Sequence, residues 1–214
     1  MATKKSTTVV TIRPPNMQSA EFHIEGISPL VIHRMDPKLQ AEFRAKVEAG
    51  STPTGKKKHE AREVAEIVEA AKYIGQTNGE RWDGFNASAL RCACIDACRV
   101  CNFKMTLAKM SIFCLEDGRD IYNPLYPLVR IIGNAEPSEM MGRTSTGVAM
   151  LIFRPRYFPW AANVRLRFDG DQFKLQDVTN LLARVGMQVG LCEGRPFSKN
   201  SSGVGWGTFE ITGA

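Results

Sequence analysis

Residues 181–211 read LLARVGMQVGLCEGRPFSKNSSGVGWGTFEI, and they combine three patterns that decide how the rest of the chain is interpreted. Apolar residues recur at helical spacing from Val178 to Val189, which predicts a helix. A loop with five glycines follows, and residues 208–211 then form a short strand. The glycines are Gly190, Gly194, Gly203, Gly205 and Gly207.

Glycine lacks a Cβ, so a loop of this composition can bring backbone N–H groups close to a phosphate chain. The alternative is that these glycines serve only to make turns. Arg195 and Lys199 lie inside the loop with no acidic residue between them, and this charge favours a phosphate contact. We therefore expect Arg195, Lys199, Gly203 and Gly205 to line a path for nucleic acid.

Size and charge narrow the class of partner. The chain has 214 residues, which is enough for one substantial core, with 43% hydrophobic and 23% charged residues. A formal net charge of +6 favours a polyanionic partner, most often nucleic acid. No apolar run approaches the roughly 20 residues needed to span a bilayer, and residues 1–8 lack the pattern of a signal peptide. We expect a cytoplasmic protein with no membrane partner.

Four of the six cysteines fall within residues 92–101, inside an expected helix. Cys94, Cys98 and Cys101 have a spacing that would allow an iron–sulfur cluster, but cysteine is also a common small residue of protein cores. We favour core packing with reduced thiols. No histidine stands near other ligands at zinc spacing, so we expect neither a metal nor a cofactor.

The order of expected elements predicts an α+β fold with a ferredoxin-like or RRM-like core, an antiparallel sheet, a helical insertion and a C-terminal glycine-rich loop. Residues 1–19 are expected to form a flexible arm, and 20–214 a single domain with the insertion at about 35–80. The segments 75–84 and 133–146 are interpreted as loops. Expected strands are 20–25, 111–115, 126–132, 147–153, 163–168 and 208–211, and expected helices are 36–49, 60–74, 87–103 and 175–189.

Further basic residues are candidates for contacts with nucleic acid. Arg154, Arg156 and Tyr157 form a mixed basic and aromatic patch, whose arginines suit phosphates and whose ring could stack on an unpaired base. Arg165 and Arg167 alternate with apolar residues, so they should share one face of a strand. The remaining candidates, all in segments interpreted as loops or linkers, are Lys56, Lys57, Lys58 and Arg143.

Three short segments resemble a known superfamily. They are Gly26–Arg34 (GISPLVIHR), Phe85–Leu90 (FNASAL) and Gly190–Pro196 (GLCEGRP). Together with the C-terminal helix, glycine-rich loop and strand, they resemble the RAMP superfamily, the RRM-like proteins that coat guide RNA in CRISPR complexes, and within it a group of uncharacterised phage proteins. The resemblance implies an RNA-binding or DNA-binding protein that assembles side by side along a strand. Since some RAMP relatives cleave RNA with a histidine, it also makes His33 the candidate for acid–base chemistry.

The function predicted from these observations is non-catalytic binding of single-stranded nucleic acid, by a phage-encoded homo-oligomer or filament in the host cytoplasm. Two alternatives remain open. One is a phage structural or assembly protein, and the other is a metal-independent endoribonuclease.

Overall fold

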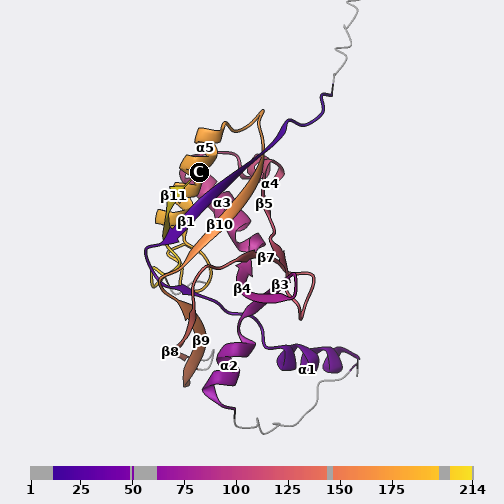
Figure 1. Cartoon of the computed structure of the whole chain (residues 1–214), viewed down its shortest axis with the longest axis vertical. Helices are drawn as coiled ribbons and strands as arrows, with labels where there is room; N and C mark the ends of the chain where they lie inside the picture. The colour runs from indigo at the N-terminus through magenta and orange to yellow at the C-terminus, as the bar shows by residue number, and fades with distance from the viewer. Residues whose placement is uncertain (1–11, 49, 51–61, 144–146, 198–202, 214) are drawn as a thin grey trace, which may run out of the picture.

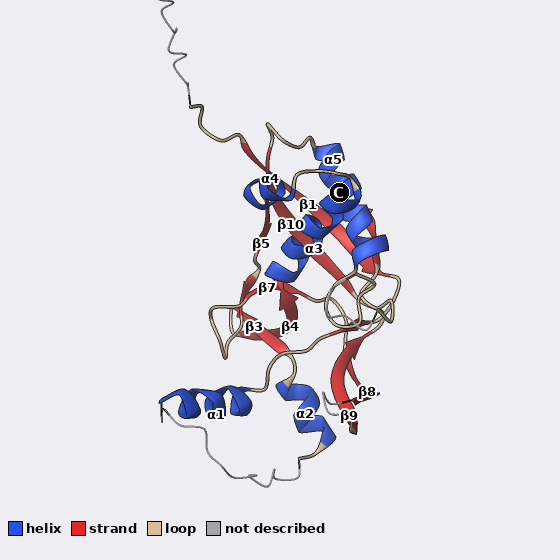
Figure 2. Ribbon diagram, turned by 180° about the vertical axis from the view of Figure 1, so that it is seen from behind, coloured by secondary structure: helices blue, strands red, loops and turns tan. Residues whose placement is uncertain are grey.

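The computed structural model describes residues 12–48, 50, 62–143, 147–197 and 203–213. Its central feature is a four-stranded antiparallel sheet with the strand order β11-β1-β10-β5. The four strands are β1 (Met17–Gly26), β5 (Ile112–Leu115), β10 (Ala161–Asp169) and β11 (Phe209–Gly213). Figures 1 and 2, seen from opposite sides, show α3 (Ala87–Val100) and α5 (Leu175–Arg184) on one face of this sheet.

Alternation along β1 and β10 explains why this sheet has one buried face. Phe22 pairs with Val164, and it is buried together with Ile24 of β1 and with every second residue of β10, from Ala162 to Phe168. These side chains pack against α3, α5 and the π-helical turn η1 (Val185–Val189) in one hydrophobic cluster. The side chain of Asn86 caps α3 by accepting a hydrogen bond of 2.8 Å from Ser88 N, as expected for its sequence position.

Two smaller sheets complete the fold. One has the order β3-β4-β7-β6, and the other consists of β2, β9 and β8. Their strands are β2 (Leu30–Val31), β3 (Tyr73–Thr77), β4 (Glu80–Asn86), β6 (Gly118–Arg119), β7 (Pro127–Arg130), β8 (Ala135–Arg143) and β9 (Ala149–Tyr157). Helices α1 (Pro37–Glu48) and α2 (Val64–Ala70) and the β8–β9 hairpin extend from the same end of the molecule, while α4 (Met105–Ser111) lies near the other end (Figure 1).

The prediction of an α+β fold with antiparallel sheets is confirmed, but two segments interpreted as loops are strands. Residues 133–146 contain most of β8, which includes Pro137 and Gly142 and owes its extended form to nine pairs with β9. Residues 75–84 lie in β3 and β4, where Gly75 leaves room for the indole of Trp82. Sequence propensity missed these strands because their stability comes from cross-strand pairing and from the packing of Trp82 on Gly75.

The expected insertion at 35–80 contains α1 and α2, as predicted, but it also contains β3. The helix expected at 60–74 ends at Ala70, because Tyr73–Thr77 pairs with β4. Most of the expected arm, residues 1–11, lies outside the described residues, and β1 already begins at Met17.

The cysteines of α3 divide into two groups. Cys94 and Cys98 are buried in the main hydrophobic cluster, as predicted, whereas Cys101 is exposed at the end of the helix. Within the described part of the chain, no group of three or more potential ligands is placed to hold a metal ion. In the same residues, no helix is both long and apolar enough to cross a membrane.

Burial should make the thiols of α3 react at different rates. Burial raises the pKa of Cys98 to about 11 and also raises the pKa of Cys94, so both thiols stay protonated near pH 8. We expect iodoacetamide to modify the exposed Cys92 and Cys101 first, as measured by mass spectrometry of tryptic peptides. The same reaction in 8 M urea is the control, and it should remove the difference. Equal rates in the native protein would contradict this placement of α3.

Candidate nucleic-acid interface

The segment 26–34 joins the main sheet to the glycine-rich loop and to the β8–β9 hairpin through its backbone. Gly26 N donates to Trp160 O at 2.8 Å, and Gly207 N donates to Pro29 O at 2.8 Å. Strand β2, within the same segment, pairs with the end of β9. Two of the three segments quoted for the RAMP resemblance, 26–34 and 190–196, therefore lie in contact although they are far apart in the sequence.

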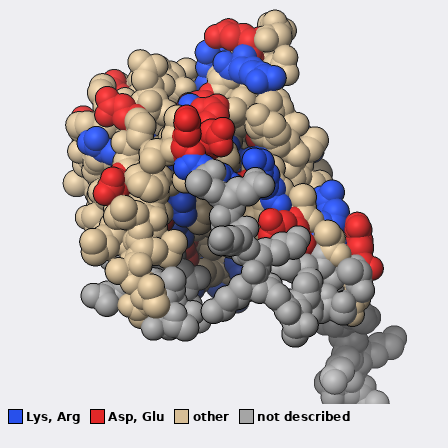
Figure 3. All heavy atoms as spheres, turned by 90° about the horizontal axis from the view of Figure 1, so that it is seen from below, with Lys and Arg blue, Asp and Glu red and all other residues tan. Residues whose placement is uncertain are grey.

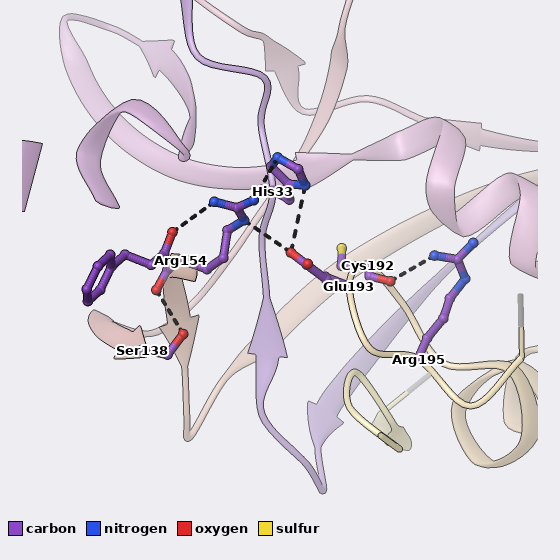
Figure 4. Close-up of polar contacts among 7 residues, drawn as sticks. His33, Ser138, Arg154, Cys192, Glu193 and Arg195 are labelled. Carbon is purple, nitrogen blue, oxygen red and sulfur yellow. Dashed lines mark hydrogen bonds and ion pairs between the residues drawn. The ribbon is translucent and has the colours of Figure 1, made fainter. Parts of the chain in front are cut away.

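His33, Arg154 and Glu193 meet where this segment, β9 and the glycine-rich loop come together (Figure 4). Arg154 Nε lies 3.3 Å from the Glu193 carboxylate, and Arg154 Nη2 lies 3.0 Å from His33 Nε2. The basic and aromatic patch that contains Arg154 thus lies beside the glycine-rich loop, and the contact is between β9 and this loop.

The charge of Arg154 is already balanced in this cluster. Besides Glu193, Arg154 Nη1 donates to Phe153 O at 2.9 Å, and the side chain is largely buried. Arg195, in the same region, donates to Cys192 O at 2.8 Å (Figure 4). An arginine whose N–H groups already bind a carboxylate and carbonyls has few donors left to bind a phosphate. The cluster therefore links the segment 26–34, β9 and the glycine-rich loop at the junction where they meet.

The glycines of the loop fall into two groups. Gly190, Gly194 and Gly207 all have positive φ, and at Gly194 and Gly207 an added Cβ would overlap Trp206 or Leu191. At these positions the turn-forming interpretation is correct. Gly203 and Gly205 also have positive φ, but an added Cβ there would meet nothing within 4 Å. These two remain candidates for a close approach to a ligand.

The face of the main sheet opposite α3 and α5 carries the arginines of β10, as the alternation predicted. Arg167 is exposed, and its guanidinium lies over the Phe113 ring at 5.3 Å from the centroid. Arg165 is half-exposed; its Nη2 lies 3.0 Å from Asp117 and donates to Glu116 O at 2.7 Å. This open face thus combines an exposed basic side chain, a half-buried aromatic ring that also lies 5.1 Å from the Arg91 guanidinium carbon, and a second arginine that is partly neutralised.

A polar pocket of about 560 Å³ adjoins this face at Asn163. Arg81, Arg130 and Asn134 also line it. Asp117 links the pocket to the sheet, since it accepts Arg130 N at 2.9 Å and pairs with Arg165. Sequence reasoning missed Arg81, Arg130 and Asn134 because they lie in segments that were interpreted as loops or as a buried strand. Only the folded chain brings them beside β10.

Among the other predicted contact residues that the structure describes, Tyr157 and Arg156 do not join this face. Tyr157 is fully buried and donates its hydroxyl to Asp83 at 2.8 Å, so the prediction that its ring stacks on a base is wrong. Arg156 lies on the hairpin at 3.7 Å from Glu136. Arg143 closes β8, but its side chain lies outside the described set, as do Lys56, Lys57, Lys58 and Lys199. The end of the molecule shown in Figure 3 carries basic and acidic side chains intermingled.

No known protein family and no curated protein matches this chain in sequence. The functional assignment therefore depends on the described geometry. That geometry separates a neutralised junction at Arg154 from an open, partly basic sheet face at Arg165 and Arg167.

The contacts of His33 with Arg154 and Glu193 predict how its pKa should change when either partner is replaced. Partial burial and the positive charge of Arg154 lower this pKa below its ordinary value of 6.5, and Glu193 opposes them. Glu193→Gln should lower the pKa further and Arg154→Gln should raise it, as measured from the His33 Cε1–H shift in an NMR titration. Because the folded pKa is depressed, His33 should contribute stability that declines as pH falls through 6.5 toward the folded value. Identical pKa values in all three proteins would exclude the junction geometry.

Proposed function

We propose that the protein binds single-stranded nucleic acid across the open face of the main sheet. The observation that carries this proposal is the exposure of Arg167 beside Phe113, with Arg165 two residues away on the same face. A guanidinium can contact a backbone phosphate, and its planar face can stack on an unpaired base. A duplex hides its bases inside the helix, so this combination favours single strands.

The connectivity supports a ferredoxin-like core as the origin of this face. The strands of the main sheet and the two packed helices follow the chain order β1, α3, β5, β10, α5, β11, and the sheet order is β11-β1-β10-β5. This is the order of two interleaved βαβ units. RRM domains, which share that arrangement, bind unpaired bases on the sheet face that the helices leave open. Two insertions, one after β1 and one after β5, then supply the strands of both smaller sheets.

A second candidate function, assembly with other proteins, is favoured by the β8–β9 hairpin. Met141 and Leu151 are exposed and directly opposite each other on one face of the hairpin, and Met150 is exposed on its other face. Contiguous apolar side chains on a projecting element are typical of contact surfaces between proteins. We propose that the same hairpin contacts a neighbouring copy when the protein assembles along a strand, so that the two candidate functions are compatible.

Substitution of the sheet arginines tests the proposed function. Arg167→Ala should weaken binding to a single-stranded oligonucleotide by about 1–3 kcal/mol, as expected when a charge-assisted hydrogen bond is removed. The slope of log K against log salt should also become shallower by about 0.7 for each phosphate that the variant no longer neutralises. Fluorescence anisotropy over a salt series measures both quantities. The matched control is Arg184→Ala, which removes an exposed arginine from α5 on the opposite face.

A gain-of-binding variant makes the test sharper. Glu21 is exposed on β1 and pairs in register with Arg165, so its carboxylate should repel a strand that lies on this face. Glu21→Gln should therefore strengthen binding, most clearly at low salt, where electrostatic screening is weakest. If Arg167→Ala and Glu21→Gln both bind like the parent, the open face is not the binding surface, and assembly through the hairpin becomes the leading function.

A further inference from the structure

Arg34 and Asp120 form a buried ion pair between the segment 26–34 and the loop after β6. Their residues are only 2% and 1% exposed, and Arg34 Nε donates to Asp120 Oδ2 at 3.1 Å. Asp120 also accepts backbone hydrogen bonds from Ile74 N at 3.2 Å and Asn123 N at 3.1 Å. The carboxylate is thus well satisfied, and its role in holding these segments together is clear.

The guanidinium of Arg34 is not satisfied. Its two terminal nitrogens, Nη1 and Nη2, are buried and have no acceptor among the residues that the structure describes. Buried N–H groups almost always have a partner, and those of a charged group are the most costly to leave without one. The ion pair with Asp120 uses only the Nε–H donor of Arg34. The burial of the N–H donors on Nη1 and Nη2 therefore needs another explanation.

A pocket of about 670 Å³ lies beside this arginine, between α1 and α2. The ring of Tyr122 lines it and lies 4.8 Å from the Arg34 guanidinium carbon. Tyr122 is 56% exposed, so little packing holds its ring in place. A ligand that displaces or slides along this ring would gain access to the donors of Arg34.

The charges around the pocket indicate which kind of ligand fits. Arg34, Lys38 and Arg62 line it together with Asp36, Glu66 and Glu69, so basic and acidic groups are equal in number. Arg62 pairs with Asp36, and Glu69 pairs with Lys72 at 2.8 Å. Glu66 makes no ion pair within the described part of the chain. A free anion gains little binding energy in a pocket whose basic and acidic groups are equal in number. A ligand with both hydrogen-bond acceptors and donors can bind groups of both kinds.

We propose that this pocket binds an unpaired guanine base of the nucleic acid; the inference therefore rests on the proposed function. Guanine has two acceptors side by side, O6 and N7, and these match the paired terminal donors of an arginine. Its N1–H and N2–H donors suit the carboxylate of Glu66. Tyr122 supplies an aromatic surface for stacking, and Lys38 a positive charge for the adjoining phosphate. Adenine has a donor next to N7, and this donor would face the N–H groups of Arg34.

Titration with free mononucleotides tests the pocket separately from strand binding. Guanosine monophosphate should bind at least about tenfold more tightly than adenosine monophosphate, in line with one bidentate base contact. Inosine monophosphate, which lacks N2, and 7-deazaguanosine monophosphate, which lacks N7, should each lose most of that preference. In the unmodified protein, addition of guanosine monophosphate should shift the ¹⁵N resonances of the Arg34 side chain.

Two exposed variants and a control complete the experiment. Glu66→Gln and Tyr122→Ala change exposed side chains of the pocket, so both variants should fold normally. Glu66→Gln should reduce the preference for guanosine monophosphate several-fold, whereas Tyr122→Ala should weaken the binding of guanosine and adenosine monophosphates alike, because stacking does not depend on the base. Glu63→Gln removes the same charge from the start of α2 at a position outside the pocket lining and should leave the preference unchanged.

The possible failures are distinguishable. If guanosine and adenosine monophosphates bind equally, or if inorganic phosphate binds as tightly as either, the guanine pocket is excluded, whether or not the protein binds single-stranded oligonucleotides. Oligo(U) and oligo(dT) contain no guanine and report on the open face alone. Binding of these oligonucleotides without a guanine preference would overturn this inference and leave the proposed function standing. Failure to bind them would overturn the proposed function.

Discussion

The backbone hydrogen bonds of residues 26–34 are the constraint on which the rest of this structure depends. This segment leaves the main sheet at Gly26, pairs with β9, accepts from the glycine-rich loop and ends at the buried Arg34. Each such bond contributes only about 1 kcal/mol net, but leaving a buried donor or acceptor without a partner costs up to about 3 kcal/mol. The segment therefore fixes the three sheets relative to one another, because no single bond can be broken cheaply.

Ser28 shows how specific this junction is. Its hydroxyl accepts from Thr208 N at 2.9 Å, and its carbonyl accepts from the indole of Trp160 at 2.8 Å. One residue thus connects the last strand of the main sheet to the end of the β8–β9 hairpin. Pro29 follows it and has no N–H, so the turn leaves no donor without a partner at this point. Arg154 and Glu193 lie 3.3 Å apart in a largely buried position, so their charges partly neutralise each other and are poor ligands for anything else.

The contrast between Arg154 and Arg167 follows from the same principle. Both are arginines on strands of a basic protein, and composition alone treats them alike. Arg154 binds Glu193 and a backbone carbonyl in a largely buried position, so its charge stabilises the folded chain. Arg167 lies over an aromatic ring on a face that α3 and α5 leave open, so its charge is accessible to a partner. Accessibility and pairing, rather than residue type, separate structural from functional arginines here.

The sequence by itself determined the elements whose signals are local. The alternation of β1 and β10, the cap at Asn86 and the helical periodicity from Val178 to Val189 were all sufficient to predict those elements and their buried faces. It also predicted which face of β10 carries Arg165 and Arg167, since side chains alternate with a period of two.

Only the tertiary structure decided the features that depend on distant partners. Tyr157, for example, is fully buried at a place where its hydroxyl donates to Asp83, 74 residues away in the sequence. The pocket beside Arg34 likewise combines α1, α2 and the loop after β6. Local propensity carries no information about such pairings, because their free energy arises from contacts between segments that are far apart in the chain.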